Sequence, residues 1–202
     1  MTVVQRLFVA CAVMILAASP AIAASPTEDL KGYIDRVVTV LEKPEMKDAS
    51  HAAERQGIVR SIANEGLDMG ESSRRVLGDA WKTKSAAERA RFTELFTSLI
   101  YSAYLSKVAG YDGEKMAYDG ESVTDREAIV RTRVLARGGG VTPVTFHLVR
   151  DAAGRWRVWN AEFEGMSLVG NYHAQFSRII RTASYDELVK RLEERTKALA
   201  TK

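Results

Sequence analysis

The residue types that most often carry out catalysis or bind metals are few and widely separated in this sequence. The three histidines, His51, His147 and His173, lie far apart, and none forms a HExxH-type pair that would bind zinc. The single cysteine, Cys11, lies in the apolar N-terminal segment, so the rest of the chain has no thiol for catalysis or zinc binding. The sequence therefore predicts neither a metal site nor a cofactor.

Two carboxylates near the end of the last expected strand are the best candidates for acid–base catalysis. Glu162 and Glu164, with Tyr104 and Tyr172 as proton donors, could form the kind of site that a curved sheet supports in some isomerases and hydrolases. No pattern in the sequence directs these side chains to one point, and solvated carboxylates at a strand edge are the simpler interpretation. We therefore expect a protein that is not an enzyme.

The N-terminal residues 1–23 have the pattern of a secretory signal peptide. Arg6 precedes an apolar run, which ends in the small-residue cleavage pattern Ala21-Ile22-Ala23. The run is too short to span a bilayer, and it continues well beyond Cys11, which argues against lipid attachment at that cysteine. We expect a cleaved signal peptide and an exported, soluble protein of residues 24–202.

The composition predicts one globular domain that does not bind nucleic acid. The chain has 202 residues, of which 46% are hydrophobic, and its formal net charge of +3 includes Arg6, the only charged residue of the predicted signal. A charge so close to zero argues against the concentrated excess of Lys and Arg that nucleic-acid-binding proteins need. No repeat or proline-rich linker divides the chain, so we expect residues 24–202 to form a single domain.

Helical periodicity occupies both ends of this domain, where apolar residues recur at every third or fourth position. The clearest stripe follows Ser85 and Glu88, which form a capping-box pattern, and it keeps one apolar face over several turns. A second capping-box pattern, Ser184 with Glu187, precedes the last helix. The periodicity predicts helices over residues 30–41, 50–66, 76–81, 85–108, 168–180 and 184–199.

Residues 111–163 alternate apolar and polar side chains with a period of two, as in strands with one buried face. The three glycines 138–140 predict a turn between strands, because they lack the Lys-Ser/Thr pair that follows in a nucleotide-binding loop. The predicted fold is α+β, with a helical layer packed on an antiparallel sheet of about four strands. On the last strand we place Trp159, Ala161 and Phe163 on the inner side, rather than Trp156 and Val158.

A specific motif lies in the C-terminal third of the chain. A tryptophan-bearing strand, residues 154–160, is followed by the turn Glu164-Gly165-Met166-Ser167-Leu168 and by a helix containing Asn171-Tyr172 and Gln175-Phe176. This order resembles the signature of the periplasmic MlaC family, also called the toluene-tolerance auxiliary family, in which an EG-x-SL turn precedes an NYR-x-QF helix. The middle of the chain resembles the same family at Leu77, Trp81, Ser85, Glu88, Arg89, Phe92, Phe96, Tyr104, Tyr111 and Gly113.

The resemblance implies a monomeric periplasmic lipid carrier with a curved, NTF2-like sheet and with acyl chains inserted between the sheet and the helices. It would carry phospholipid between an outer-membrane lipoprotein complex and an inner-membrane ABC transporter complex that has an MCE domain. Residues 178–189 are similar to the hopanoid-associated HpnM subgroup, so hopanoid is the alternative ligand. An NTF2-like enzyme acting on a hydrophobic small molecule, or a module that binds a partner protein, would also be compatible with the apolar pattern.

The apolar faces of the predicted elements give the expected lipid-binding residues. One wall would come from the long helix, the opposite wall from the strands, and the closed end from the helix after the sheet. The residues are Phe92, Phe96, Leu99, Ile100 and Tyr104; Val130, Val134, Phe146, Leu148 and Phe163; and Val169, Tyr172 and Phe176. Their spacing alone is equally compatible with an ordinary filled core. Two departures from the family pattern, Asn160 in place of Asp and His173 in place of Arg, are expected to change a polar contact at the cavity mouth or at a docking surface.

Overall fold

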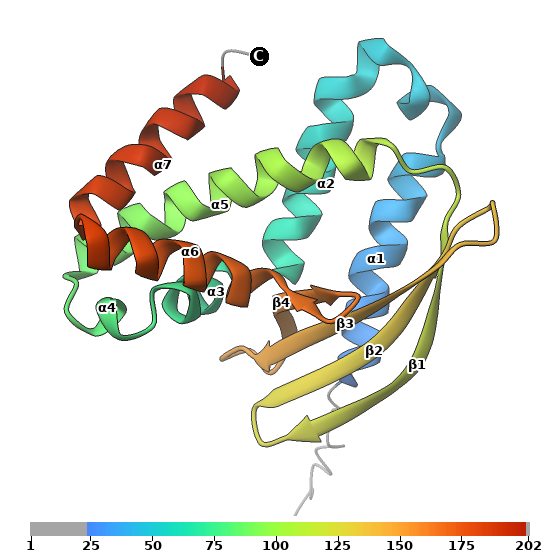
Figure 1. Cartoon of the computed structure of the whole chain (residues 1–202). Coiled ribbons are helices and arrows are strands. Elements are labelled where there is room, and N and C mark those ends of the chain that lie inside the picture. Colours follow the sequence, from blue (N-terminus) through green and yellow to red (C-terminus); the bar gives the residue numbers. More distant parts are fainter. Residues whose placement is uncertain (1–23, 201–202) are drawn as a thin grey trace, which may run out of the picture.

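The computed structural model describes residues 24–200, apart from the side chains of residues 105–109 and 199–200. The predicted signal peptide, residues 1–23, lies outside the described residues, as does Cys11 within it. Figure 1 shows helices at both ends of the chain and strands between them. In order, the elements are α1 (Pro26–Glu42), the short 3-10 helices η1 (Pro44–Lys47) and η2 (Ala49–His51), α2 (Ala52–Gly66), α3 (Met69–Leu77), α4 (Asp79–Lys82), α5 (Ala86–Ala109), β1 (Lys115–Thr124), β2 (Glu127–Leu135), β3 (Val141–Arg150), β4 (Trp156–Phe163), β5 (Met166–Ser167), α6 (Leu168–Thr182) and α7 (Tyr185–Ala200).

The strands form one antiparallel sheet in the order β1-β2-β3-β4-β5, so that each strand pairs with its neighbour in the sequence. One register shift lies between Tyr118 and Gly120 in β1, and a second lies in β4 opposite His147 and Leu148. Such bulges bend a sheet, and this sheet is visibly curved in Figure 1. The predicted α+β fold is confirmed, and a fifth strand is present because β5 pairs with the end of β4.

Side-chain caps mark the starts of several helices, although α2 and α4 begin without one. The predicted capping box before α5 is present, since Glu88 N donates to Ser85 Oγ at 3.2 Å and Ser85 N donates to Glu88 Oε2 at 2.8 Å. Before α7, Glu187 N donates to Ser184 Oγ at 3.0 Å, as the second capping-box pattern predicts. Within residues 24–200, no helix combines the length and the apolar character that crossing a membrane requires.

Gly78 divides the third predicted helix in two. The sequence predicts one helix over residues 76–81, but α3 ends at Leu77 and α4 begins at Asp79. Gly78 has φ 55° and ψ −126°, a backbone conformation that is accessible to glycine because it lacks a Cβ atom. The prediction of a single helix is therefore wrong, and α3 begins earlier than expected, at Met69.

The buried apolar residues of the described chain form three clusters. The helical cluster joins α3, α5, α6 and α7; the sheet cluster joins the inner face of the sheet to α1; the α1–α2 cluster lies between α1 and α2. Figure 1 shows that α1 lies against the sheet and that α5 lies between α7 and the sheet. The buried members are, in the helical cluster, Val76, Leu77, Phe92, Leu95, Phe96, Leu99, Ile100, Tyr101, Val169, Phe176, Tyr185, Leu188 and Leu192; in the sheet cluster, Leu30, Ala128, Val130, Leu148, Trp156 and Val158; and in the α1–α2 cluster, Val40, Leu41, Met46, Val59 and Ile62.

The bulge in β4 changes which side chains face the helices. Leu148 pairs with Val158 and His147 pairs with Asn160, so Trp159 is the extra residue between these pairs. Val158 faces the inner side of the sheet together with Leu148, whereas the Trp159 ring lies beside His147 on the opposite side and packs against the helical cluster. Its expected place on the inner side is therefore wrong. The residues on the inner side of β4 are Trp156, Val158, Ala161 and Phe163.

Substitution of Gly78 by alanine should destabilise the fold. A Cβ atom at this position would lie 2.9 Å from Cε1 of His173, and the backbone conformation is unfavourable for alanine. We expect the free energy of unfolding to fall by about 1–3 kcal/mol. Gly57→Ala is the control, because Gly57 lies within α2 with nothing within 4 Å of an added Cβ, and it should stabilise by about 0.5–1 kcal/mol. Thermal denaturation measures both changes, and an unchanged melting temperature for Gly78→Ala would contradict the strain argument.

Candidate functional site

The predicted wall residues divide between the helical cluster and the sheet. On the helices, all of them are buried in the helical cluster or packed against it: Phe92, Phe96, Leu99, Ile100, Tyr104, Val169, Tyr172 and Phe176. On the sheet, Val130 and Leu148 are buried in the sheet cluster, Phe146 packs against it, Val134 is half-buried and Phe163 is 40% exposed. The predicted helical wall residues thus gather in one cluster, whereas on the sheet only Val130, Phe146 and Leu148 belong to a cluster, which is a different one.

Aromatic rings fill the centre of the helical cluster. The Phe96 ring lies edge-on to Tyr172, with 5.3 Å between centroids, and edge-on to Phe176 at 6.0 Å. Phe92 stacks on Phe96 at 5.9 Å. Each such pair contributes about 0.5–1.5 kcal/mol beyond the burial of apolar area. In this conformation the rings of α5 therefore pack mainly on one another and on the rings of α6.

A row of four side chains crosses the inner face of the sheet. The register partners from β1 to β4 are Tyr118, Thr132, Val144 and Phe163. Thr132 Oγ1 donates to Val144 O at 2.8 Å, whereas the Tyr118 hydroxyl is buried and has no hydrogen-bond partner among the described residues. Burial raises the pKa of Tyr118 to about 12. Tyr118 was not among the residues predicted from the sequence, although the alternation of Met116 with Tyr118 places both on one face of a strand.

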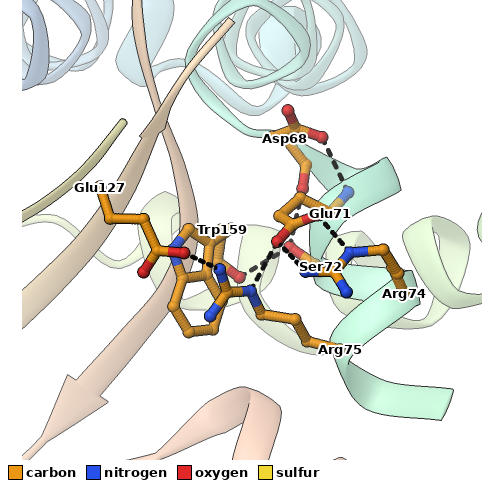
Figure 2. A network of polar contacts seen from close by, with 7 residues as sticks. All are labelled: Asp68, Glu71, Ser72, Arg74, Arg75, Glu127 and Trp159. Atoms are coloured by element: carbon orange, nitrogen blue, oxygen red, sulfur yellow. Dashed lines mark hydrogen bonds and ion pairs between the residues drawn. The ribbon is translucent and has the colours of Figure 1, made fainter. Parts of the chain in front are cut away.

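Arg75 joins helix α3 to the sheet (Figure 2). Its guanidinium carbon lies 3.7 Å from the centroid of the Trp159 ring, and its nitrogens donate to Glu71 at 2.6 Å and to Glu127 at 2.5 Å. Hydrogen bonds from Arg74 and, more weakly, from Arg75 lower the pKa of the Glu71 carboxyl, although burial opposes this effect. Because Glu127 lies on β2 and Trp159 on β4, this one arginine connects α3 to two strands.

The helices also bond to backbone carbonyls along the outer edge of β4. Asp68 N donates to Val158 O at 2.8 Å. Ser72 Oγ donates to Trp159 O at 2.7 Å, as Figure 2 shows. Strand β5 pairs with β4 at Glu162 and beyond, so it does not reach these carbonyls. A buried carbonyl without a partner is costly, and Asp68 before α3 and Ser72 within α3 supply the missing donors.

The two departures from the family pattern form contacts inside the protein. Asn160 is 5% exposed, and its Oδ1 accepts hydrogen bonds from Val169 N at 3.0 Å and from Ser167 Oγ at 3.2 Å, at the start of α6. His173 Nδ1 lies 2.9 Å from Val76 O, so this nitrogen carries the proton and ties α6 to α3. Both side chains position α6 relative to the elements beside it.

The residues considered for acid–base catalysis lie on different elements. Glu162 Oε1 is 2.8 Å from His147 Nε2 on the neighbouring strand, and Glu164 is exposed at the turn after β4. Tyr104 and Tyr172 pack against the helical cluster, where burial raises the pKa of each phenol. Among the described residues, no group of three or more His, Cys, Asp or Glu side chains is placed to hold a metal ion.

A groove of about 330 Å³ lies on the surface between α1 and α2. Beside it, Arg36 Nη1 pairs with Glu65 Oε2 at 2.7 Å. The lining residues are Arg36, Thr39, Val40, Ile58, Ser61 and Ile62, and none of them is a predicted wall residue.

The fold and these surfaces define a class of α+β protein in which one helix packs on the inner face of a curved antiparallel sheet, further helices are attached at its β4 edge, and apolar residues gather on both layers. Within this class, the chain belongs to the MlaC protein family, whose family model matches residues 31–194. The family resemblance found in the sequence is confirmed. The similarity of residues 178–189 to the HpnM subgroup stays a prediction.

Two known proteins are similar to this chain. The intermembrane phospholipid transport system binding protein MlaC of Haemophilus influenzae is 22% identical over 141 residues, which are 68% of this chain and 66% of that protein, slightly less than two thirds of its length. A solved structure of the phospholipid-binding protein from Ralstonia solanacearum, in complex with a phospholipid, is 20% identical, with a TM-score of 0.75. The match covers 88% of this chain and 99% of that chain, so the two proteins share their fold.

Replacement of Arg75 by methionine should weaken the attachment of α3 to the sheet. The variant loses its ion pairs with Glu71 and Glu127 and the contact with Trp159, and we expect the free energy of unfolding to fall by about 1–2 kcal/mol. The matched control is Arg74→Met, which removes an ion pair with the same Glu71 and should cost less than about 0.5 kcal/mol. Urea denaturation measures both values, and equal losses for the two variants would contradict the role assigned to Arg75.

Proposed function

We propose that this protein carries phospholipid across the periplasm, with the acyl chains held between the helical cluster and the inner face of the sheet. The observation that carries the proposal is that no predicted wall residue of the helices shares an apolar cluster with a predicted wall residue of the sheet. A domain of this size usually has one contiguous core, with smaller clusters beside it. Here Leu67 packs against both clusters, and acyl chains between them would bury the remaining apolar surface of each.

Membership of the MlaC family supports phospholipid as the ligand, as do the names of the two similar proteins. The need for a carrier follows from solvation. Two acyl chains contain about 30 methylene groups, and exposing each to water costs about 0.8 kcal/mol, which is on the order of 25 kcal/mol for the lipid. Transfer from a bilayer into an apolar protein interior is nearly balanced, so a carrier needs an apolar binding surface and a way to open.

The proposed transport route connects two membranes. Residues 1–23 would direct export and be removed, and the remaining monomer would receive and deliver lipid in the periplasm. The partners would be an outer-membrane lipoprotein complex and an inner-membrane ABC transporter complex with an MCE domain. The name of the Haemophilus relative, which places it in an intermembrane phospholipid transport system, supports this arrangement.

Binding of a lipid requires movement of side chains, or of the helices relative to the sheet. The rings of Phe92, Phe96 and Phe176 contact one another in the present conformation. Acyl chains would reach these rings only after the helices and the sheet separate or the rings change rotamer. No chemical step is part of this function, and Glu162, the carboxylate considered for catalysis, is already paired with His147.

Hopanoid is the second candidate cargo, because residues 178–189 are similar to the HpnM subgroup. Native mass spectrometry of protein purified without detergent distinguishes the candidates. A stoichiometric mass increase equal to a phospholipid supports the proposal, and one equal to a hopanoid supports the second candidate. Protein that stays empty in the presence of added lipid would contradict both.

Phe163→Ser tests the sheet wall. The Phe163 side chain is 40% exposed, so its removal should change the free energy of unfolding little. Lipid binding should weaken about tenfold, because about 60 Å² of apolar surface at about 25 cal/mol per Å² is lost from the contact. Val141→Ser is the matched control, since Val141 is 53% exposed near the same end of the sheet but faces the other side. Equal lipid affinity of the two variants would exclude Phe163 from the wall.

A further inference from the structure

Tyr118 lies within the surface that the proposed function assigns to the cargo. It stands on β1 directly opposite Thr132, and its ring packs against the sheet cluster. On β2, Thr132 lies between Val130 and Val134, which face the same side and belong to the proposed sheet wall. Tyr118 therefore brings a polar group into an apolar surface.

The Tyr118 hydroxyl is a buried donor for which the described residues supply no acceptor. The other hydroxyl of the row is satisfied, because Thr132 Oγ1 donates to Val144 O at 2.8 Å. Nearly all buried polar groups in proteins have a hydrogen-bond partner, since an unpaired one destabilises the fold. A partner for Tyr118 has to come from outside the described residues.

Other buried polar atoms without partners lie in different places. Ser73 is on α3, and Trp159 packs against the helical cluster. Arg150 on β3 and Trp156 on β4 are register partners at the end of these strands opposite to Phe163, and their Nε and Nε1 atoms lack hydrogen-bond partners among the described residues. Among these atoms, the Tyr118 hydroxyl is the one that stands in the row containing Phe163.

The surroundings of this hydroxyl favour a neutral acceptor. Burial and, to a smaller extent, the carboxylate of Asp35 on α1 raise the pKa of Tyr118 to about 12, so the hydroxyl keeps its proton at neutral pH. The apolar neighbours disfavour a phosphate group at this place. An ester carbonyl is neutral, and it is the first acceptor reached along an acyl chain from its apolar end.

We infer that the Tyr118 hydroxyl donates a hydrogen bond to the carbonyl oxygen of an ester-linked acyl chain and thereby selects diacyl lipid esters as cargo. The inference rests on the proposed carrier function and adds the group that is recognised. A cargo that brings only hydrocarbon to this position leaves the hydroxyl unpaired and binds more weakly.

Competition between two phospholipids with the same headgroup and chain lengths, one a diester and one a diether, tests this inference. Lipid-free protein is mixed with both lipids, and native mass spectrometry measures the ratio of the two complexes. The wild-type protein should prefer the diester about three- to tenfold, the usual net contribution of one hydrogen bond. Tyr118→Phe should abolish this preference and keep the affinity for the diether.

Tyr111→Phe is the matched control, because the Tyr111 hydroxyl already donates to Glu42 at 3.1 Å and lies outside the row. It should keep the preference for the diester. Lipid-free Tyr118→Phe should melt at the same temperature as the wild type or higher, since a buried unpaired donor is removed; a lower melting temperature would reveal a partner within the protein and overturn the inference.

The result for the wild-type protein separates the inference from the proposed function. Equal binding of the two lipids, or a preference that survives in Tyr118→Phe, would overturn the ester contact while leaving the carrier function intact. Binding of neither lipid would contradict the carrier function itself, and the inference with it.

Discussion

Carbonyl groups on the outer edge of β4 accept hydrogen bonds from Asp68, just before α3, and from Ser72 within α3, because β5 is too short to pair with them. An open strand edge exposes unpaired backbone groups, and here Asp68 N and Ser72 Oγ supply the donors. The bulge at Trp159 turns an indole ring towards the helices at the same place, where Arg75 covers it. Helices α3 and α6 are therefore held to the sheet mainly at β4, whereas α1 packs across the inner face of the sheet.

Because polar contacts attach the helices to β4, the apolar surfaces of the helical cluster and of the sheet remain available for other contacts. Polar contacts have strict distances and angles, so they fix where α3 and α6 stand on β4. Apolar contacts have no such direction, and the same surfaces can pack on each other, on protein side chains or on acyl chains. A carrier needs this combination, because the protein must stay folded both with and without a ligand between its layers.

The inner face of the sheet is not uniformly apolar, and its few polar groups differ in what they require. Thr132 bonds to the backbone of the next strand, so it adds nothing for a ligand to satisfy. Tyr118 presents a donor in the same row for which the described part of the chain offers no acceptor. In an apolar interior one unpaired donor discriminates between ligands more sharply than a large apolar area does, because hydrocarbons of similar size bury similar area.

Sequence periodicity indicated the apolar faces of the helices and of β2 and β3, and the motif of residues 154–176 indicated the family, because these patterns are local. The capping box at Ser85 was predictable for the same reason. Only the tertiary structure decided which apolar faces meet, and it placed no residue of the predicted helical wall in a cluster with a residue of the predicted strand wall. The break at Gly78 and the bulge at Trp159 also required it, because a backbone torsion and an extra strand residue depend on the partners that pack and pair with them.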